Sequence, residues 1–452
     1  MLEKELAYKI LKEAILYSPA DETEIILQGG KSALTRFANN YIHQNVIQKD
    51  YYLTVKAILG KRMGVASCNV FEGTHLKEVV DAACEMAKHS KEDPDLLPVP
   101  EPVQYNEVSN TYFKSTIDFS PQDRADSIKK VINLCESKNF KAAGSFSNGD
   151  YMVSIMNSKN LFAYHSFTNA EFNLTVNTPE NGTSWVEYSS NKVEEINIEE
   201  LAKQAIIRAE LNKNPITLDP GKYTVILEES AVISLLQFMC YLGFAGQDFI
   251  EDRSFMSGKI GQKIVGDQIT IIDDAYREEV LGVPFDFEGI PKKPVVLIEN
   301  GIARSVVYDR KTAHKAGVES TGHALPPPNP HGPLPINVIM LPGDSTVEEM
   351  IATTDYGVLV TRFWYDNVVN EKQAIITGMT RDGTFLIENG KITKTLKNMR
   401  YNESILTALS NVVSIGKTTK TFGQFGKKAV PALKINNFHF TGVSDEKLGG
   451  TT

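Results

Sequence analysis

The spacing of apolar residues predicts a helix at the start of the chain, followed by strands. In "MLEKELAYKILKEAILYS", Leu6, Ile10, Leu11 and Ile15 recur at helical spacing between charged residues. The runs "TEIILQ", "LTRFANNYIHQNVIQ" and "YYLTVKAILGKRMGVASC" are rich in Val, Ile, Thr and Tyr in near alternation, which predicts a meander of short strands. A single apolar stripe then predicts a helix over residues 75–89.

The next stretch predicts a surface connector and a second set of helices and strands. Residues 92–111 contain four prolines and many acids, which is typical of a connector. A helix is predicted at about 121–138, with Ser120 as its cap and Pro121 in its first turn. The strand-like runs "KAAGSFSN", "YMVSIMNS", "LFAYHSFT", "AEFNLTVNT" and "SWVEYSS" follow, and a helix at about 196–212 ends this half.

Two segments of this half resemble each other. Residues 39–55 and 159–176 both contain Asn, an apolar pair, a nearby His and an aromatic residue before Leu-Thr-Val. Each segment is followed, after a gap, by a predicted helix. One interpretation is a duplicated strand-and-helix unit, and the alternative is chance similarity between strand-like sequences.

The second half is predicted to be mostly β. After a boundary near residue 216, the strand "YTVILE" leads into an apolar helix that we expect Ser230 to cap. The motif "LIENG" occurs at 297–301 and again at 386–390, and each copy predicts a strand that ends in a tight Asn-Gly hairpin.

The fold class is therefore predicted as α+β, with two domains. The N-terminal α/β domain spans residues 1–216, as two sub-units at about 20–90 and 112–215 that the proline-rich connector joins. The β-rich C-terminal domain spans residues 217–452.

Composition narrows the classes of function. The 452 residues carry a net charge of −9, which argues against a nucleic-acid partner because such a surface needs clustered basic residues. No apolar run is long enough to cross a bilayer, so no membrane partner is expected. The first residues lack the continuous apolar region of a secretory signal, and the four cysteines form no CxxC pair. We expect a cytoplasmic protein.

Candidate chemistry from single residues is sparse. The eight histidines form none of the usual metal-binding spacings. His323 is the best candidate, because it lies in the proline-rich stretch "VESTGHALPPPNPHGPLP", and loops on a rigid scaffold often carry binding residues. Glu319, Ser320, His323 and His331 are the candidate substrate-binding residues. The alternative is a rigid surface loop.

Two further groups are interpreted as structural. Cys240 has bulky neighbours and no charged residue close in sequence, which predicts a buried apolar cysteine rather than a nucleophile. The adjacent acids Asp273 and Asp274 are predicted to cap turns and to form surface ion pairs.

Several stretches in order along the chain resemble one family. They are "LTRFANNYIHQN" (34–45), "SGKIGQKI" (257–264), "VLIENGI" (296–302), "STGHA" (320–324) and "GMTRDGTFLIENGKI" (378–392). Together they resemble the TldD/PmbA family, which was formerly labelled as modulators of DNA gyrase and is now grouped with the zinc metallopeptidases.

The resemblance also marks where this chain departs from a metallopeptidase. In the TldD type, the helix that corresponds to "LLQFMCYLGFAGQDF" (235–249) carries two zinc-binding histidines and a catalytic glutamate. The resemblance places the histidines at Gln237 and Leu242, the glutamate at Phe238, and a third ligand, a cysteine, at Ile415. Apolar side chains and one amide cannot hold a catalytic zinc. The resemblance therefore implies no catalytic residues, no metal and no cofactor, and we expect a helix that ends near Gly243 and fills a vacated site as core.

The second type of the family, called TldE or PmbA, lacks the zinc motif and pairs with a TldD subunit. The stretch "STGHA" is more similar to this type. The resemblance implies a non-catalytic subunit that presents unfolded or modified peptides to a zinc-bearing TldD-type chain. One alternative is a stand-alone peptide-binding or regulatory homodimer. Another is a hydrolase with an altered site that uses His323, Glu319 or Cys240.

Overall fold

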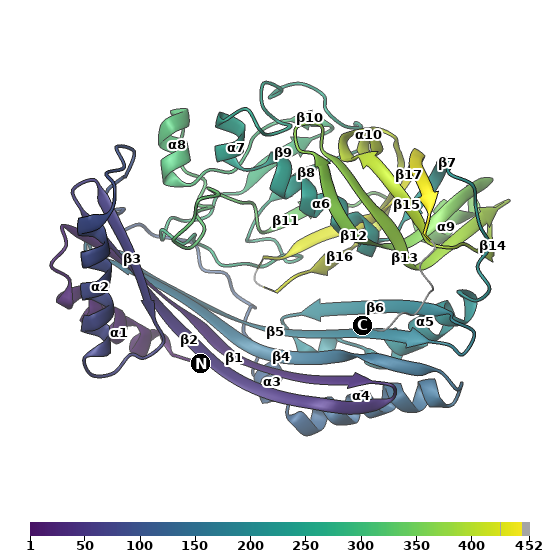
Figure 1. Cartoon of the computed structure of the whole chain (residues 1–452), viewed down its shortest axis with the longest axis horizontal. Helices are drawn as coiled ribbons and strands as arrows, with labels where there is room; N and C mark the ends of the chain where they lie inside the picture. Colours follow the sequence, from purple (N-terminus) through teal and green to yellow (C-terminus); the bar gives the residue numbers. More distant parts are fainter. Residues whose placement is uncertain (425, 445–452) are drawn as a thin grey trace.

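Two β-sheets face each other in the computed structural model, which describes residues 1–424 and 426–444 (Figure 1). The first sheet has six strands in the order β3-β2-β1-β4-β5-β6, and the second has eleven. The α+β class predicted from the sequence is confirmed. Residue 425 and the last eight residues of the predicted C-terminal domain, 445–452, lie outside the described residues.

Residues before the predicted boundary form the six-stranded sheet and its helices. The elements are α1 (Lys4–Tyr17), β1 (Glu22–Ala38), β2 (Tyr41–Leu59), β3 (Arg62–Cys68), α2 (His75–His89), α3 (Lys114–Asp118), α4 (Pro121–Glu136), β4 (Lys141–Asn157), β5 (Phe162–Asn177), β6 (Thr183–Ser190), η1 (Val193–Glu195) and α5 (Ile198–Leu211). The Ser120 hydroxyl accepts from the backbone N–H of Asp123, and the Asp123 carboxylate accepts from the N–H of Ser120. The predicted cap of α4 is therefore confirmed.

The first half is built from a repeated unit. Both α1-β1-β2-β3-α2 and α4-β4-β5-β6-α5 place a helix before and after three strands, and β1 pairs with β4 antiparallel at the centre of the sheet. Asn40 and Asn160 have φ angles of 63° and 68° in the turns before β2 and β5. The similar segments 39–55 and 159–176 thus occupy equivalent places, which favours the interpretation of a duplication.

The first sheet lies between a helical layer and the second half of the chain (Figure 1). Side chains alternate between the faces of a strand. Ile25 and Leu27 of β1 pack with α1 and α2, whereas Ile26, on the other face, joins a cluster with Val153 of β4 and Phe285 of the second half.

The remaining elements form the second sheet and its helices. They are β7 (Gly221–Leu227), α6 (Glu229–Gly243), α7 (Gly246–Ile250), β8 (Ile271–Asp273), β9 (Val295–Glu299), β10 (Ile302–Ala303), α8 (Arg310–Ala316), β11 (Val338–Met340), α9 (Val347–Ala352), β12 (Tyr356–Asn370), β13 (Ile375–Glu388), β14 (Lys391–Thr395), β15 (Met399–Ser404), α10 (Ile405–Ser410), β16 (Val412–Phe422) and β17 (Lys428–Val443). Both Asn-Gly hairpins are confirmed: φ is 50° and 77° at Asn300 and Gly301, and 51° and 75° at Asn389 and Gly390.

The pairings of five strands close a ring. β17 pairs with β15, then β13, β12 and β7 follow, and β7 pairs back with β17. Aromatic side chains gather at these strands, where the rings of Phe363 and Tyr401 lie 4.5 Å apart and those of Phe438 and Phe440 lie 5.4 Å apart. Helix α6 packs on this group through β12 and β17.

The predicted cap of α6 is wrong. The helix begins at Glu229 with Glu228 as its N-cap, and no side chain caps it. Ser230 lies in the first turn, and its hydroxyl accepts instead from the Lys420 ammonium at 3.3 Å. The predicted end at Gly243 is confirmed, because the helix spans Glu229–Gly243. A Cβ at Gly243 would lie 2.0 Å from the Phe255 ring, so a larger residue does not fit there without a shift.

The strands of the first sheet all precede residue 216, and those of the second sheet all follow it. We therefore propose that the two sheets correspond to the two predicted domains. Across the described residues, none of the helices has both the length and the apolar character that a membrane span needs.

Candidate functional site

The four positions that the sequence resemblance places at the family's zinc site differ in their surroundings. Leu242 and Ile415 are 4% exposed and belong to one apolar cluster around α6. Phe238 is half-buried and packs against that cluster, whereas Gln237 is exposed. The expectation that this part of α6 is core thus holds for Leu242 but is wrong for Gln237 and Tyr241. The reason is that Gln237 and Tyr241 are four residues apart, so they share the outward face of the helix.

These residues do not fit a zinc ion. Leu, Phe and Ile offer no nitrogen, oxygen or sulfur donor, and a single amide cannot complete a tetrahedral ligand set. Within residues 1–424 and 426–444, no group of three or more His, Cys, Asp and Glu side chains could hold a metal ion.

His323 lies in the protein interior, where it anchors the proline-rich loop. It is 2% exposed, and its Nε2 lies 2.9 Å from Asp273 Oδ1 while its Nδ1 lies 2.9 Å from the Thr321 hydroxyl. Both ring nitrogens are therefore engaged within the fold. These contacts give His323 a structural role, and its contact with a substrate stays a prediction.

Asp273 is also buried, so the prediction that it forms surface ion pairs is wrong. Burial would raise the pKa of its carboxyl, but the charge and hydrogen bond of His323, with help from Lys292, hold that pKa at about 2. The second carboxylate oxygen accepts from the backbone N–H groups of Ile336 and Asn337 at 2.8 and 3.0 Å. This network joins the start of β11 to the loop.

The structure does not bring the other predicted loop residues to His323. Glu319 is exposed and pairs with Lys293 at 2.8 Å, and the Ser320 hydroxyl donates to the Tyr308 carbonyl. His331 is exposed. Contact of Glu319, Ser320 and His331 with a substrate stays a prediction. Cys240 is buried, and burial raises the pKa of its thiol to about 12, which opposes a role as nucleophile.

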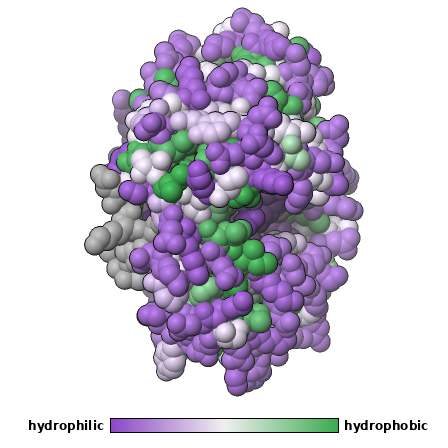
Figure 2. Space-filling model, turned by 90° about the vertical axis from the view of Figure 1, so that its right-hand side faces the viewer, coloured by the Kyte–Doolittle hydropathy of each residue, from purple (hydrophilic) through white to green (hydrophobic). Residues whose placement is uncertain are grey.

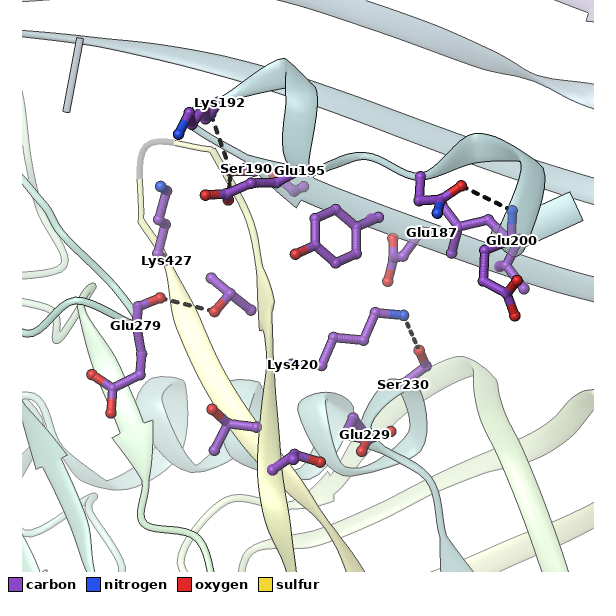
Figure 3. A pocket seen from close by; sticks show the side chains of 18 of the residues that line it. Glu187, Ser190, Lys192, Glu195, Glu200, Glu229, Ser230, Glu279, Lys420 and Lys427 are labelled. Atoms are coloured by element: carbon purple, nitrogen blue, oxygen red, sulfur yellow. Dashed lines mark hydrogen bonds between the residues drawn. The ribbon is translucent and has the colours of Figure 1, made fainter. Parts of the chain in front are cut away.

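A cleft between the two sheets is the better candidate site. Its volume is about 730 Å³, within the range of ligand pockets. One wall comes from β6 and α5, and the opposite wall comes from the start of α6, β12 and β16 (Figure 3). Pockets of this size between domains commonly bind ligands.

Glu187 and Lys420 face each other across this cleft (Figure 3). Burial raises the pKa of the Glu187 carboxyl to about 7, although the charges of Lys420 and Arg362 oppose this shift. Burial likewise lowers the pKa of Lys420, and the carboxylates of Glu187, Glu229 and Glu228 oppose that change. Opposed shifts of this kind in a cleft are typical of functional sites.

Buried ionisable groups also lie at both ends of the cleft. Glu228 is 9% exposed and accepts from Arg208 at 2.8 Å, and burial raises the pKa of its carboxyl. At the other end, Lys427 is 5% exposed and donates to the side chain of Asn191. Burial lowers the pKa of Lys427 to about 8, which the nearby Glu195 partly opposes.

A stack of aromatic and guanidinium groups forms the edge of the cleft. The Arg362 guanidinium lies 4.5 Å from the Trp185 ring centre and 5.2 Å from that of Trp364, and Arg381 lies 4.6 Å from Trp364 on β12. Arg362 also donates from Nε to Asp382 at 2.7 Å. Because Trp185 belongs to β6, these cation–π contacts hold the two walls together.

Sequence reasoning missed this cleft. The stretch "SWVEYSS" carries one signal, because Trp185, Glu187 and Ser189 alternate with the inward-packed Val186 and Tyr188. That pattern predicts a polar face on β6. It does not reveal which other segment faces it.

Two family models match the chain. The PmbA/TldA metallopeptidase domain 1 matches residues 23–87, and the PmbA/TldA metallopeptidase C-terminal domain matches residues 220–442. Together they cover more than half of the sequence.

Curated relatives match over shorter regions. The Metalloprotease TldD homolog of Haemophilus influenzae is 28% identical over 257 residues, which are 54% of this chain and 53% of that protein. The Metalloprotease PmbA of Escherichia coli O157:H7 is 26% identical over 197 residues, 42% of this chain and 41% of that protein. The chain spans about half the length of the curated relatives it matches.

Solved structures share the fold over almost the whole chain. The crystal structure of TldE from Thermococcus kodakarensis has a TM-score of 0.88 and 21% identity, and covers 96% of this chain and 100% of that one. A Thermotoga maritima protein described as a modulator of a DNA gyrase has a TM-score of 0.84 and 20% identity, and covers 96% and 100%. At these identities the likeness establishes the fold alone. With the family models and the ordered motifs, it follows that the chain belongs to the TldD/PmbA family of metallopeptidase-related proteins.

Proposed function

We propose that this chain is the non-catalytic subunit of a peptide-processing pair, in which a zinc-bearing TldD-type chain carries out hydrolysis. The observation that carries the proposal is α6, which keeps its helix and packing but has no metal donor at Phe238 or Leu242, while Ile415 on β16 offers none either. A family fold that lacks the catalytic ligands is suited to binding or enclosing a peptide.

An open strand edge supports association with a second chain. β3 pairs with Leu53–Leu59 of β2, so no described strand covers the outer edge of residues 41–52. Tyr41, Ile47 and Tyr52 are 70%, 52% and 42% exposed there. Uncovered edges of this kind are a liability in monomers, because they pair readily with other chains.

The repeated unit strengthens this point. The equivalent part of β5 is covered by the connector, since the backbone N–H of Thr168 donates to the Thr111 carbonyl at 2.8 Å and the Thr111 hydroxyl donates to the Ser166 carbonyl. An extended segment can therefore cover the outer edge of β5, and we expect a partner subunit to supply the segment that covers the equivalent edge of β2.

A second apolar surface adds to this support. Ile207 and Leu211 of α5, Ile216 of the link and Ile392 of β14 are 58%, 53%, 41% and 38% exposed. The Thr395 hydroxyl donates to the Leu211 carbonyl, so these elements adjoin. Figure 2 shows apolar side chains gathered among hydrophilic ones on this side of the molecule.

The test is reconstitution with a TldD-type chain from the same organism. We expect a stable complex by light scattering, zinc in the partner and not in this chain, and peptidase activity that rises when both are present. Failure to form a complex, or an activity unchanged by this chain, would favour the stand-alone homodimer. Stoichiometric zinc in this chain alone would favour the altered hydrolase.

A further inference from the structure

We propose that the cleft between the two sheets binds a basic side chain of an extended peptide, with the Glu187 carboxylate as its counter-charge. This inference deepens the peptide-binding part of the proposed function and rests on it. It names a site and a ligand class: a polypeptide segment that carries Arg or Lys.

Within the part of the chain that the structure describes, Glu187 has an unpaired carboxylate in the cleft. Its side chain points from β6 into the cleft (Figure 3), and among the described residues its carboxylate has no hydrogen-bond or ion-pair partner. A carboxylate in a cleft without a donor is costly unless a ligand supplies one.

The cations near Glu187 have other partners. Lys420 donates to the Ser230 hydroxyl at 3.3 Å. Arg362 donates to Asp382 and is stacked between Trp185 and Trp364. Their charges act on Glu187 from a distance, but their donors are directed elsewhere, so the carboxylate is free to accept from a ligand.

The cleft as a whole carries more acidic than basic side chains. Its walls contain both signs, with carboxylates at residues 187, 195, 200, 228, 229, 278 and 279 and cations at residues 192, 208, 362, 420 and 427. Acids outnumber bases, so an added positive charge is favoured over an added negative one. A guanidinium or ammonium group fits this balance, and Trp185 offers apolar contact for its aliphatic stem.

The volume is consistent with such a ligand. A cavity of about 730 Å³ holds several residues of an extended peptide, and the polar side chains that line it can form hydrogen bonds with a peptide backbone.

The experiment measures peptide affinity with this chain alone, so it is independent of any partner subunit. The probes are fluorescein-labelled dodecapeptides of Gly, Ser and Asn with an acetylated N-terminus and one central Arg, Gln or Glu. Fluorescence anisotropy should give an affinity for the Arg peptide roughly tenfold or more above that for the Glu peptide.

Variants locate the site. Glu187→Gln should weaken binding of the Arg peptide by roughly tenfold and leave the Glu peptide unaffected or slightly tighter, and Glu187→Asp should restore part of the affinity. Thr418→Lys, an exposed change on the cleft wall, should also weaken the Arg peptide. Glu136→Gln makes the same charge change on the exposed face of α4 and is the matched control.

A spectroscopic readout confirms the place of binding. The chain has two tryptophans, so Trp364→Phe leaves Trp185, on the cleft wall, as the sole tryptophan. Binding of the Arg peptide should change the fluorescence emission of Trp185. Equal affinities for the Arg and Glu peptides would overturn the proposal, as would an Arg-peptide affinity that neither Glu187→Gln nor Thr418→Lys lowers. Neither result would bear on complex formation with a TldD-type chain.

Discussion

At the scale of single residues, Glu187 combines exposure to the cleft with an unfavourable setting for its charge. Burial raises the pKa of its carboxyl from 4.5 to about 7, so the folded protein binds this proton more tightly than the unfolded chain does. The stability that the neutral carboxyl contributes is complete below pH 4.5 and is lost as the pH rises through 7. The ionised Glu187 carboxylate therefore lowers the stability of the folded protein, and a cationic ligand that pairs with it would restore that stability.

The Glu187→Gln variant tests this cost. Because Gln cannot ionise, the variant should be more stable than the parent at pH 8, and the difference should shrink towards zero near pH 4. Urea unfolding at several pH values measures it. Lys420 and Arg362 favour the ionised form and Glu171 opposes it, and none of these is changed. A stability difference that is the same at pH 5 and pH 8 would contradict the assignment, and Glu136→Gln should show no difference that depends on pH.

At the scale of elements, α6 has two faces with different roles. Leu235, Leu236 and Leu242 pack into the core, whereas Gln237 and Tyr241 are exposed. Two of the positions that the resemblance places at zinc ligands therefore lie in different environments: Leu242 is buried and Gln237 is exposed.

Substitutions on the two faces of α6 should differ in cost. Leu242→Ala opens a cavity and should lower the free energy of unfolding by about 2–5 kcal/mol. Gln237→Ala on the exposed face should change it by less than about 0.5 kcal/mol. Denaturant unfolding gives both values. Similar small losses for the two variants would mean that Leu242 does not contribute to the core.

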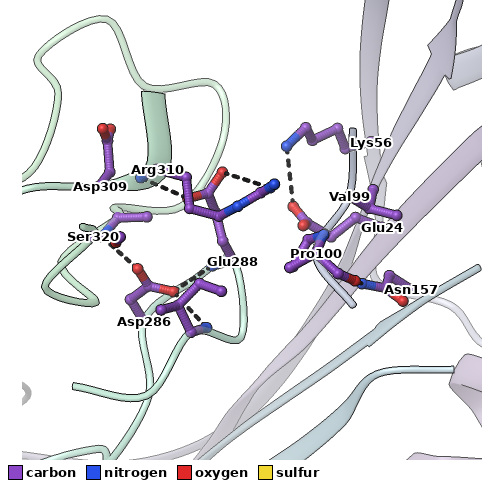
Figure 4. A network of polar contacts seen from close by, with 12 residues as sticks. Glu24, Lys56, Val99, Pro100, Asn157, Asp286, Glu288, Asp309, Arg310 and Ser320 are labelled. Carbon is purple, nitrogen blue, oxygen red and sulfur yellow. Dashed lines mark hydrogen bonds and ion pairs between the residues drawn. The ribbon is translucent and has the colours of Figure 1, made fainter. Parts of the chain in front are cut away.

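At the scale of the whole molecule, apolar contacts and buried charges join the two sheets at one end. The cleft lies between the sheets at the other end. Phe285 and Phe287 pack on Ile26 and Val153 of the first sheet. Beside them, Lys56 pairs with Glu24 at 3.3 Å, and Arg310 approaches Glu288 at 3.9 Å (Figure 4). Glu288 also acts on the pKa of Lys56, so the two pairs form one network across the boundary.

Removing Lys56 should weaken this junction. Lys56→Met leaves Glu24, which is 1% exposed, without its cation, and should cost about 3–5 kcal/mol in the free energy of unfolding. Lys77→Met breaks the exposed Lys77–Asp81 pair on α2 and should cost less than about 1 kcal/mol. If both variants lose equally little stability, the network does not hold the sheets together.

Local patterns determined much of this protein. The helix over 75–89, the capped start of α4 and both Asn-Gly hairpins follow from residues close in sequence, because periodicity and turn chemistry act over a few positions. The ordered motifs also determined the family, and the sequence itself shows apolar side chains and one amide where the resemblance places the family's zinc site.

The tertiary structure decided which charges are buried and what they face. His323 and Asp273 lie 50 residues apart in the chain, yet they form one buried pair, so Asp273 has no surface role and His323 is held inside the fold. The cleft is assembled from β6, α5, α6, β12 and β16, so Glu187 meets Lys420 only after the sheets face each other. Desolvation and distant contacts depend on packing, and no local pattern in the sequence encodes them.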